Sequence, residues 1–241
     1  MQTVSKAERM WDGGPVFLQA KTAKLTTDTV LLADFAEIGR AQRGADLGCG
    51  SGALMLLLLW RDGRLKMTGV ELQEDAARIA EENLRLNGLE GRGKILCADL
   101  REDHPALPRG GFDLVIANPP YYATDSGLLS PDEGRAAARG ETCCTLEEFC
   151  ASASALCRSG GKVFLSYRPE RLSELLQQCC RVHLEPKRLR LVHYRPSAEA
   201  SIVLLEARKD GKPGLRIEPP LILHDEAGEE TEEYKRIYHR E

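Results

Sequence analysis

A rigid polar stretch, Asn118-Pro119-Pro120-Tyr121-Tyr122, follows an apolar run of the kind that forms a buried strand. Pro119 restricts Asn118 to an extended conformation, and two consecutive prolines stiffen the turn. The Asn118 amide and the Pro119 carbonyl then offer two hydrogen-bond acceptors at one point. Such a pair can grip both N–H bonds of an amino group on an aromatic ring, draw the nitrogen toward tetrahedral geometry and free its lone pair. Tyr121 would stack on the ring.

A glycine-rich stretch, ADLGCGSGAL, places Gly48, Gly50 and Gly52 between an apolar run and a helical pattern. Glycines here let the backbone turn tightly and approach a ligand, whose anionic end meets the free N–H groups of the helix. Glu71 closes the next apolar run, where its carboxylate can accept hydrogen bonds from two ribose hydroxyls. Asp99 closes the third run and can accept from an adenine amino group. Together these residues predict a nucleotide-like cofactor.

The spacing within this glycine stretch bears on which cofactor is bound. A dinucleotide fingerprint reads G-x-G-x-x-G, whereas this chain reads G-x-G-x-G with Asp46 two residues ahead. An NAD enzyme and a plain glycine turn without a ligand remain alternatives. The D-x-G-x-G-x-G form resembles the first motif of class I S-adenosylmethionine-dependent methyltransferases. In that family the loop holds the methionine and ribose portions of the cofactor.

The resemblance implies a set of site residues. Those that it assigns to S-adenosylmethionine are Thr27, Asp46, Gly48, Cys49, Gly50, Glu71, Leu72, Asp99, Leu100 and Asn118. Those that it assigns to catalysis are Asn118, Pro119, Pro120 and Tyr121. The Asn-Pro-Pro-Tyr tetrapeptide is the signature of amino-group methyltransferases that act on adenine, cytosine, guanine or a glutamine amide.

The segment KLTTDTVLLADF resembles the stretch before the glycine motif in bacterial enzymes that methylate the adenine beside the anticodon of a valine tRNA. Its matching residues are Thr26, Asp28, Leu31, Leu32 and Ala33. Tyr122, RAAARGETCCTLEEF and PPLILHDEAGEETEEYKRIY also resemble that family, so the similarity spans roughly Thr22 to Tyr238. It implies transfer to the exocyclic amino group of an adenine in RNA, with tRNA as the partner. Methylation of a protein glutamine, or of a guanine or cytosine amino group, is the alternative, as is a binding module without turnover.

The elements that would position these residues alternate between strand and helix. Apolar runs end at Leu47, Leu72, Leu100, Asn118 and Tyr167, and helical patterns cover Ala53–Trp60, Glu74–Leu86, Leu146–Cys157 and Glu170–Arg181. A Gly160-Gly161 turn precedes the fifth run, and RLRLVHY and SIVLLEAR form a closing hairpin. This order predicts an α/β fold, a doubly wound, mostly parallel seven-stranded Rossmann-like sheet with a terminal antiparallel hairpin. We expect an N-terminal segment (1–35) over the cofactor site, a methyltransferase domain (36–210) and a C-terminal extension (211–241) packed on it.

Composition bounds the remaining properties. The chain has 241 residues and a formal net charge of −4, which argues against a protein that coats nucleic acid through a global basic field. Its eight cysteines lack the C-x2-C spacing of zinc sites, so reduced thiols and no metal are expected. The start of the chain has no hydrophobic signal region, and the run from Ala53 to Trp60 is too short for a membrane span. We expect a cytoplasmic protein, either a monomer or a weak dimer.

Contact with RNA phosphates would have to come from local positive charge. Arg135 and Arg139 follow the tyrosines and are the first candidates, and the others are Lys187, Arg188, Arg190 and Arg195. Reversing the charge of Arg135 and Arg139 together should weaken RNA binding and flatten its salt dependence. A protein that contacts fewer phosphates releases fewer counterions from the RNA when it binds. Binding titrations over a salt series measure this. A slope equal to that of the unaltered protein would contradict the assignment.

Overall fold

A computed structural model describes residues 7–19, 25–119 and 144–240. Its strands are β1 (Glu8–Arg9), β2 (Val16–Phe17), β3 (Arg43–Leu47), β4 (Lys66–Glu71), β5 (Gly93–Cys97), β6 (Phe112–Ala117), β7 (Cys157–Tyr167), β8 (Leu184–His193), β9 (Ala200–Lys209), β10 (Arg216–Ile217) and β11 (Leu221–Ile222). Its helices are α1 (Thr27–Phe35), α2 (Ala53–Arg61), α3 (Glu74–Leu86), α5 (Leu146–Leu156), the 3-10 turn η1 (Pro169–Arg171), α6 (Leu172–Arg181) and α7 (Glu232–Ile237).

The main sheet runs in the order β8-β9-β7-β6-β3-β4-β5, and the short strands β10 and β11 both pair with β8. Strands β3 to β7 pair in parallel, whereas β9 is antiparallel to both β7 and β8. The chain lays down β3 in the middle, builds β4 and β5 on one side and then returns to place β6 and β7 on the other. This arrangement confirms the predicted fold class, including its closing hairpin.

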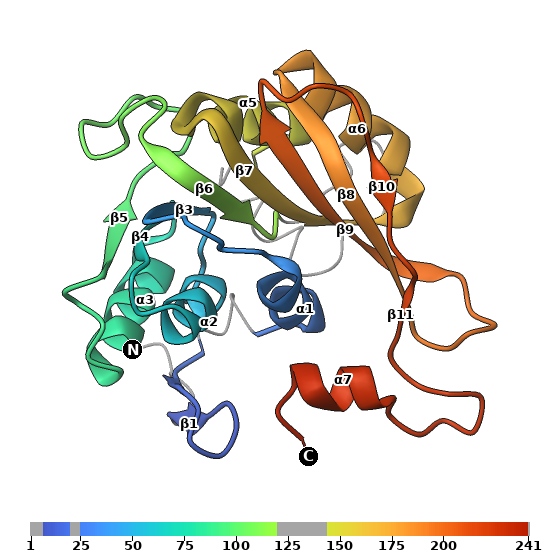
Figure 1. Cartoon of the computed structure of the whole chain (residues 1–241). Coiled ribbons are helices and arrows are strands. Elements are labelled where there is room, and N and C mark those ends of the chain that lie inside the picture. The colour runs from blue at the N-terminus through green and yellow to red at the C-terminus, as the bar shows by residue number, and fades with distance from the viewer. Residues whose placement is uncertain (1–6, 20–24, 120–143, 241) are drawn as a thin grey trace, which may run out of the picture.

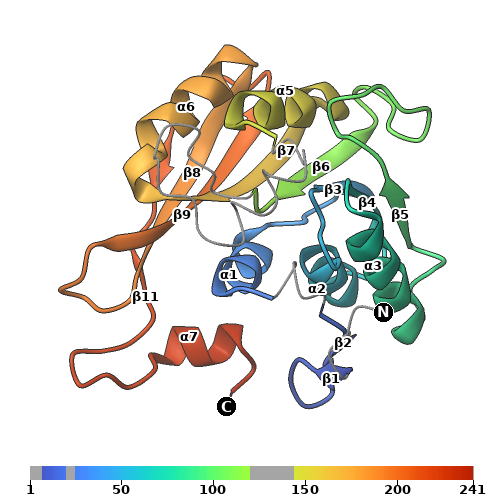
Figure 2. The ribbon, with the colours of Figure 1, turned by 180° about the vertical axis from the view of Figure 1, so that it is seen from behind.

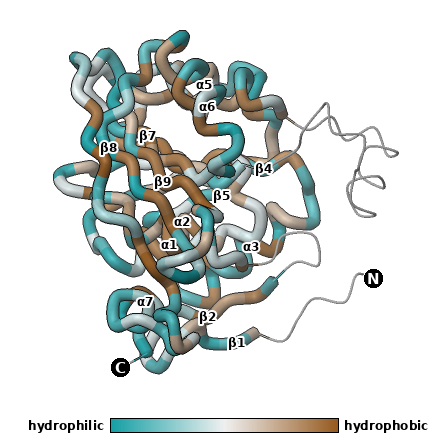
Figure 3. The backbone as a smooth tube through the Cα atoms, turned by 90° about the vertical axis from the view of Figure 1, so that its right-hand side faces the viewer, coloured by the Kyte–Doolittle hydropathy of each residue, from teal (hydrophilic) through white to brown (hydrophobic). Residues whose placement is uncertain are grey.

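Helices cover both faces of the sheet, with α1, α2 and α3 on one side and α5 and α6 on the other (Figures 1 and 2). Strand β6 shows how its residues divide between the two cores. Leu114 and Ile116 pack with the α1–α2 side, while Val115 and Ala117 pack with the α5–α6 side. Successive side chains of a strand point to opposite faces, so a strand buried on both faces reads as a continuous apolar run. Figure 3 shows this apolar character along the central strands.

The helix boundaries follow from local chemistry. Helix α5 begins with a capping box, in which the Thr145 hydroxyl accepts from the Glu148 N–H and the Glu148 carboxylate accepts from the Thr145 N–H. Helix α3 starts with Glu74 and Asp75 and stops before Gly88, whose φ of 63° ends the helix. None of the helices in the described ranges is long and apolar enough to span a bilayer.

Several elements differ from the sequence-based expectation, among them the short strands β1, β2, β10 and β11 and the helix α7, which we did not predict. The segment Thr27–Phe35 is a helix that we did not predict, because it is buried on nearly all sides and lacks a polar face to reveal its period. The Gly160-Gly161 pair is no free turn: both residues lie within β7, which shifts register against β6 at that end. Strand β5 ends at Cys97, so Asp99 and Leu100 lie in the turn beyond it.

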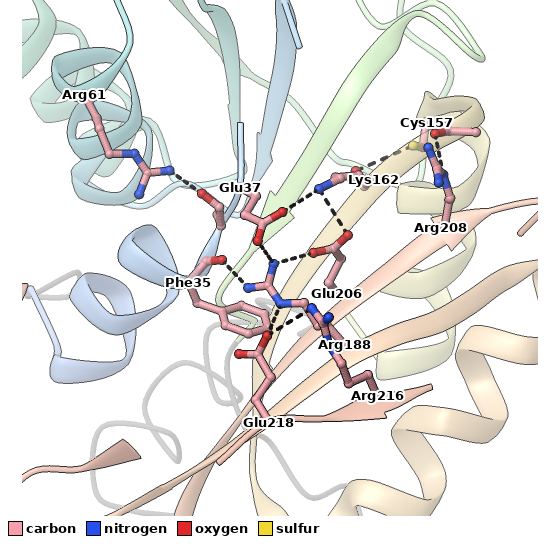
Figure 4. A network of polar contacts seen from close by, with 12 residues as sticks. Phe35, Glu37, Arg61, Cys157, Lys162, Arg188, Glu206, Arg208, Arg216 and Glu218 are labelled. Carbon is pink, nitrogen blue, oxygen red and sulfur yellow. Dashed lines mark hydrogen bonds and ion pairs between the residues drawn. The ribbon is translucent and has the colours of Figure 1, made fainter. Parts of the chain in front are cut away.

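A buried arginine, Arg188 on β8, joins three distant parts of the chain (Figure 4). Its guanidinium lies 2.9 Å from the Glu206 carboxylate on β9 and donates a 2.9 Å hydrogen bond to the Phe35 carbonyl. It also stacks over the Phe35 ring and pairs with Glu37 beyond α1. Its Nε lies 2.8 Å from Glu218 without the alignment of a hydrogen bond. The end of α1 is therefore tied to the terminal hairpin.

The two ends of the described chain also pack near α1 and α3. The Asn83 and Asn87 amides on α3 bond the backbone of the β2 segment, each donating to a carbonyl and accepting from an N–H. The Trp11 ring stacks on His239 at 4.1 Å. The N-terminal hairpin and the end that follows α7 thus support each other below the sheet, as Figure 3 shows.

Replacing Arg188 with Ala should destabilise the protein by about 3 kcal/mol, because it leaves the buried Glu206 carboxylate with less compensation. Urea unfolding measures the change. The Arg109→Ala control removes an exposed pair with Asp103 and should leave the unfolding midpoint nearly unchanged. Equal losses of unfolding free energy in the two variants would show that the buried network stabilises the protein no more than an exposed ion pair does.

Candidate active site

The glycine loop after β3 has the backbone of an anion-binding turn. Gly48, Gly50 and Gly52 have φ values of 68°, 55° and 79°, a region that favours glycine. The N–H groups of Gly48 and Cys49 donate to the Val70 carbonyl at 2.8 and 3.0 Å. The loop is therefore fixed to β4, and it leads directly into the amino end of α2.

Glu71 at the end of β4 connects this loop to the start of α3. One carboxylate oxygen accepts from the Gly50 N–H and the other from the Gln73 N–H, both at 2.8 Å. A carboxylate oxygen has two lone pairs, so Glu71 can still accept from the vicinal hydroxyls of a ribose. Leu72, which comes next, is 50% exposed and offers an apolar surface beside that carboxylate.

Asp46, one of the predicted cofactor residues, is buried at the end of β3. Its side chain is 1% exposed and accepts a 3.1 Å hydrogen bond from the Met55 N–H in the first turn of α2. Burial raises the pKa of Asp46 to about 7, and the nearby charge of Glu71 adds to that rise. Asp46 therefore holds the helix against the glycine loop. Burial also raises the pKa of the neighbouring Cys49 thiol, so this cysteine is a packing residue and no nucleophile.

Asp99 lies in the turn after β5 and is engaged by a cation. Its two carboxylate oxygens accept from the Arg101 guanidinium at 2.5 to 3.0 Å, and this hydrogen bonding lowers the pKa of Asp99. The adjacent Leu100 carbonyl accepts from Ser152 on α5. The sequence had no signal for Arg101 as a partner, and an adenine amino group would share Asp99 with it.

Asn118 follows β6 at the same edge of the sheet, and hydroxyl groups contact both ends of its amide. Its Nδ2 donates to Thr29 Oγ1 at 3.2 Å and to Thr26 Oγ1 at 3.4 Å. Its Oδ1 accepts from Ser166 Oγ at 2.5 Å. The sequence analysis did not predict Thr29 or Ser166 as site residues. The one related signal was the segment around Thr26, which resembles the tRNA enzymes. Pro119, the next residue, is buried.

The structure brings most of the predicted cofactor residues to one edge. The ends of β3, β4 and β6 are neighbours in a parallel sheet, so the glycine loop, Glu71 and Asn118 meet at the point where the strand order reverses. Thr27 opens α1 nearby, and its hydroxyl bonds with Tyr238 near the C-terminal end. The predicted residues Pro120, Tyr121, Tyr122, Arg135 and Arg139 lie outside the described residues.

The basic candidates for phosphate contacts on and near β8 lie in different surroundings. Arg188 was a candidate for a phosphate contact, and this is wrong because it is buried in its ion-pair network. Arg190 is held by Glu233 and Lys187 by the Lys212 carbonyl, whereas Arg195 lies over the exposed Tyr194 ring. Among the described residues, no three His, Cys, Asp or Glu side chains gather as a metal site would require.

Comparison with known proteins adds independent information. The family model "Methyltransferase small domain" matches residues 15–130, which contain the glycine loop, Glu71, Asp99 and Asn118. The tRNA1(Val) (adenine(37)-N6)-methyltransferase of Porphyromonas gingivalis is 29% identical over 225 residues, 89% of this chain and 86% of the relative. The chain is a class I S-adenosylmethionine-dependent methyltransferase.

Solved structures agree with this methyltransferase fold. Atu636 from Agrobacterium tumefaciens, described as a predicted O-methyltransferase, has a TM-score of 0.71 and 28% identity, covering 89% of this chain and 96% of that chain. Geranyl diphosphate methyltransferase in complex with S-adenosylmethionine has a TM-score of 0.56 and 16% identity, covering 75% and 84% of the two chains, and shares the fold alone.

The described residues of the methyltransferase fit its cofactor, S-adenosylmethionine. The glycine loop turns tightly through positive φ angles that keep side chains away from its surface, and Glu71 keeps acceptor capacity for ribose hydroxyls. Leu72 supplies exposed apolar surface for an adenine ring. The cofactor supplies an electrophilic methyl group, and these residues would hold it beside Asn118.

The raised pKa of Asp46 predicts a pH-dependent stability. Between pH about 4 and 7 the folded protein keeps a proton that the unfolded chain, with a carboxyl pKa near 3.8, has released. The stabilisation is complete below this window and is lost as the pH rises through it. Asp46→Asn cannot ionise, so its stability relative to wild type should rise across this window by up to the order of 4 kcal/mol.

Urea unfolding at a series of pH values measures the difference. Asp12→Asn, on the exposed turn after β1, is the control and should follow the wild-type curve. Parallel curves for Asp46→Asn and wild type would rule out a buried, proton-binding Asp46.

Proposed function

We propose that this methyltransferase transfers a methyl group to the exocyclic amino group of an adenine in tRNA. The observation that carries the proposal is the Asn118 amide at the end of β6, beside the glycine loop that ends β3. The Porphyromonas relative, similar over most of both chains, is named for adenine 37 of tRNA1(Val). This activity would take place in the cytoplasm, where tRNA is available.

The chemistry asked of Asn118 is orientation and hydrogen bonding. An amino group on an aromatic ring is a poor nucleophile because its lone pair is delocalised into the ring. The Asn118 amide oxygen and the Pro119 carbonyl would accept its two N–H bonds and direct the freed lone pair toward the methyl group. The nitrogen would then gain a bond to the methyl carbon as the carbon–sulfur bond of the cofactor breaks, and one N–H proton would pass to water. No strong base is needed, because most of the catalysis comes from positioning.

The adenine would have to leave its stack to reach Asn118, since its amino nitrogen must meet the methyl group. Tyr121 and Tyr122 are proposed to stack on the extruded base, and Arg135 and Arg139 to contact the RNA backbone. These four residues lie outside the described parts of the chain. Their assignment rests on the sequence motif and its resemblance to the tRNA enzymes.

The groups around Asn118 also bear on two other classes of methyl acceptor, an amide nitrogen and a hydroxyl. A glutamine side chain also carries an amide nitrogen, so it fits the same pair of acceptors and is the second candidate. An O-methyl transfer, as the description of Atu636 suggests for that protein, requires a base to take the proton of a hydroxyl. Within the described ranges, the hydroxyls of Thr26, Thr29 and Ser166 contact the Asn118 amide, and hydroxyl groups are not bases near neutral pH.

Purified protein with labelled cofactor should place label in tRNA from cells that lack the gene, and a nuclease digest should identify N6-methyladenine by mass spectrometry. Asn118→Ala should lower kcat by about 100-fold or more, because an acceptor used in the transition state is lost. Cofactor affinity should stay within about twofold, since the glycine loop and Glu71 are untouched. Gln177→Ala, which removes an exposed amide on α6, is the matched control.

The distribution of label decides between the candidates. Label found solely in a protein band would replace the tRNA assignment with the glutamine one. Cofactor binding without transfer to any fraction would identify the chain as a binding module. A normal kcat for Asn118→Ala would remove the amide from the mechanism while leaving the substrate assignment in place.

A further inference from the structure

We infer that Ser166, on β7, is a positioning residue that sets which end of the Asn118 amide faces the reacting amino group. The inference rests on the proposed role of Asn118. An amide has a donor end and an acceptor end of nearly the same shape. Only the oxygen can receive an N–H bond of the substrate, so a reversed amide would place donor against donor.

Ser166 is placed to make this choice by the register of the sheet. Strands β6 and β7 are parallel neighbours, with Ile116 opposite Phe164 and Ala117 opposite Leu165. Asn118 directly follows β6, and Ser166 is the next residue of β7. Ser166 Oγ donates to Asn118 Oδ1 at 2.5 Å. Ile116 and Phe164 both belong to the core on the α1 side, so the period of two directs Asn118 and Ser166 to that same side.

The hydroxyl proton of Ser166 determines the orientation of the Asn118 amide, because it needs an acceptor. Its side chain is 0% exposed, and a buried hydroxyl proton that lacks an acceptor is costly. In the part of the chain that the structure describes, the Asn118 Oδ1 is the acceptor that this hydroxyl reaches. If the amide were reversed, the Ser166 hydroxyl would face the Asn118 NH₂ group, which cannot accept a hydrogen bond.

The opposite end of the amide is compatible with this arrangement but does not enforce it. Thr29 is buried on α1 and accepts from Asn118 Nδ2, while its hydroxyl also lies 3.1 Å from that of Thr26. The two threonine hydroxyls can donate to each other, so they tolerate either end of the amide. Of the groups that the structure describes around this amide, Ser166 therefore sets its orientation, and Thr29 accepts from the nitrogen at the other end. An amide oxygen accepts two hydrogen bonds, so its bond with Ser166 is compatible with one from substrate.

Steady-state kinetics on Ser166→Ala test the inference, with tRNA from cells lacking the gene as the substrate. The variant should lower kcat by about 10-fold or more while the affinity for S-adenosylmethionine, measured by calorimetry, stays within about twofold of wild type. Ser154→Ala is the matched control. It removes another buried serine hydroxyl, one that bonds the Val182 carbonyl on the far side of the sheet, and should keep kcat near wild type.

A second measurement needs no substrate. In a stability cycle over Ser166→Ala and Asn118→Ala, the two losses should be non-additive, because both remove the same hydrogen bond. Thr29→Val, which keeps the side-chain shape, should lower kcat more than Thr29→Ser, which keeps the hydroxyl.

Three results would overturn the inference: wild-type kcat in Ser166→Ala, an equal loss in Ser154→Ala, or an additive stability cycle. The wild-type sample in the same assay reports separately on the proposed function. If it methylates no tRNA, the substrate assignment fails, while the stability cycle still tests the pairing of Ser166 with Asn118.

Discussion

The parallel pairing of β3 with β4 on one side and β6 on the other is the constraint on which the site depends. Asp46 is paired with Gly69 of β4 and with Ile116 of β6, so the three strands advance together and end at one edge. The loops that leave these ends diverge where the strand order reverses, and that divergence leaves room for a ligand. The glycine loop, Glu71 and Asn118 meet there although 70 residues separate the first from the last.

Helix α1 turns this edge into a site with fixed geometry. The Arg61 guanidinium on α2 donates to the Ala33 carbonyl, Arg188 of the terminal hairpin donates to the Phe35 carbonyl, and Arg236 of α7 pairs with Asp34. These charged groups hold the carboxyl end of the helix, where unpaired carbonyls attract cations. The amino end then presents the Thr26 and Thr29 hydroxyls to the Asn118 amide. Residues from the last quarter of the chain thus support chemistry at its centre.

The three acidic residues of the site differ in burial and in hydrogen-bond partners. Asp46 is buried against the amino end of α2, and its raised pKa reflects that burial. Glu71 is half-buried and uses one lone pair of each oxygen on the backbone, while Asp99 is neutralised by Arg101. Of the three carboxylates at this edge, Asp46 supports the fold, Glu71 is the proposed acceptor for the cofactor, and Asp99 pairs with an arginine.

The sequence by itself determined the strands, most of the helices and the identity of the polar residues at the strand ends, because apolar runs, glycine turns and prolines act on their nearest neighbours. Only the tertiary structure decided what those polar residues contact. Ser166 lies 48 residues from Asn118 and Thr29 lies 89 residues from it. Such pairs depend on strand register and on how a helix packs across the sheet. The burial of Arg188 and the helical state of Thr27–Phe35 have the same origin, since both follow from contacts that no local pattern records.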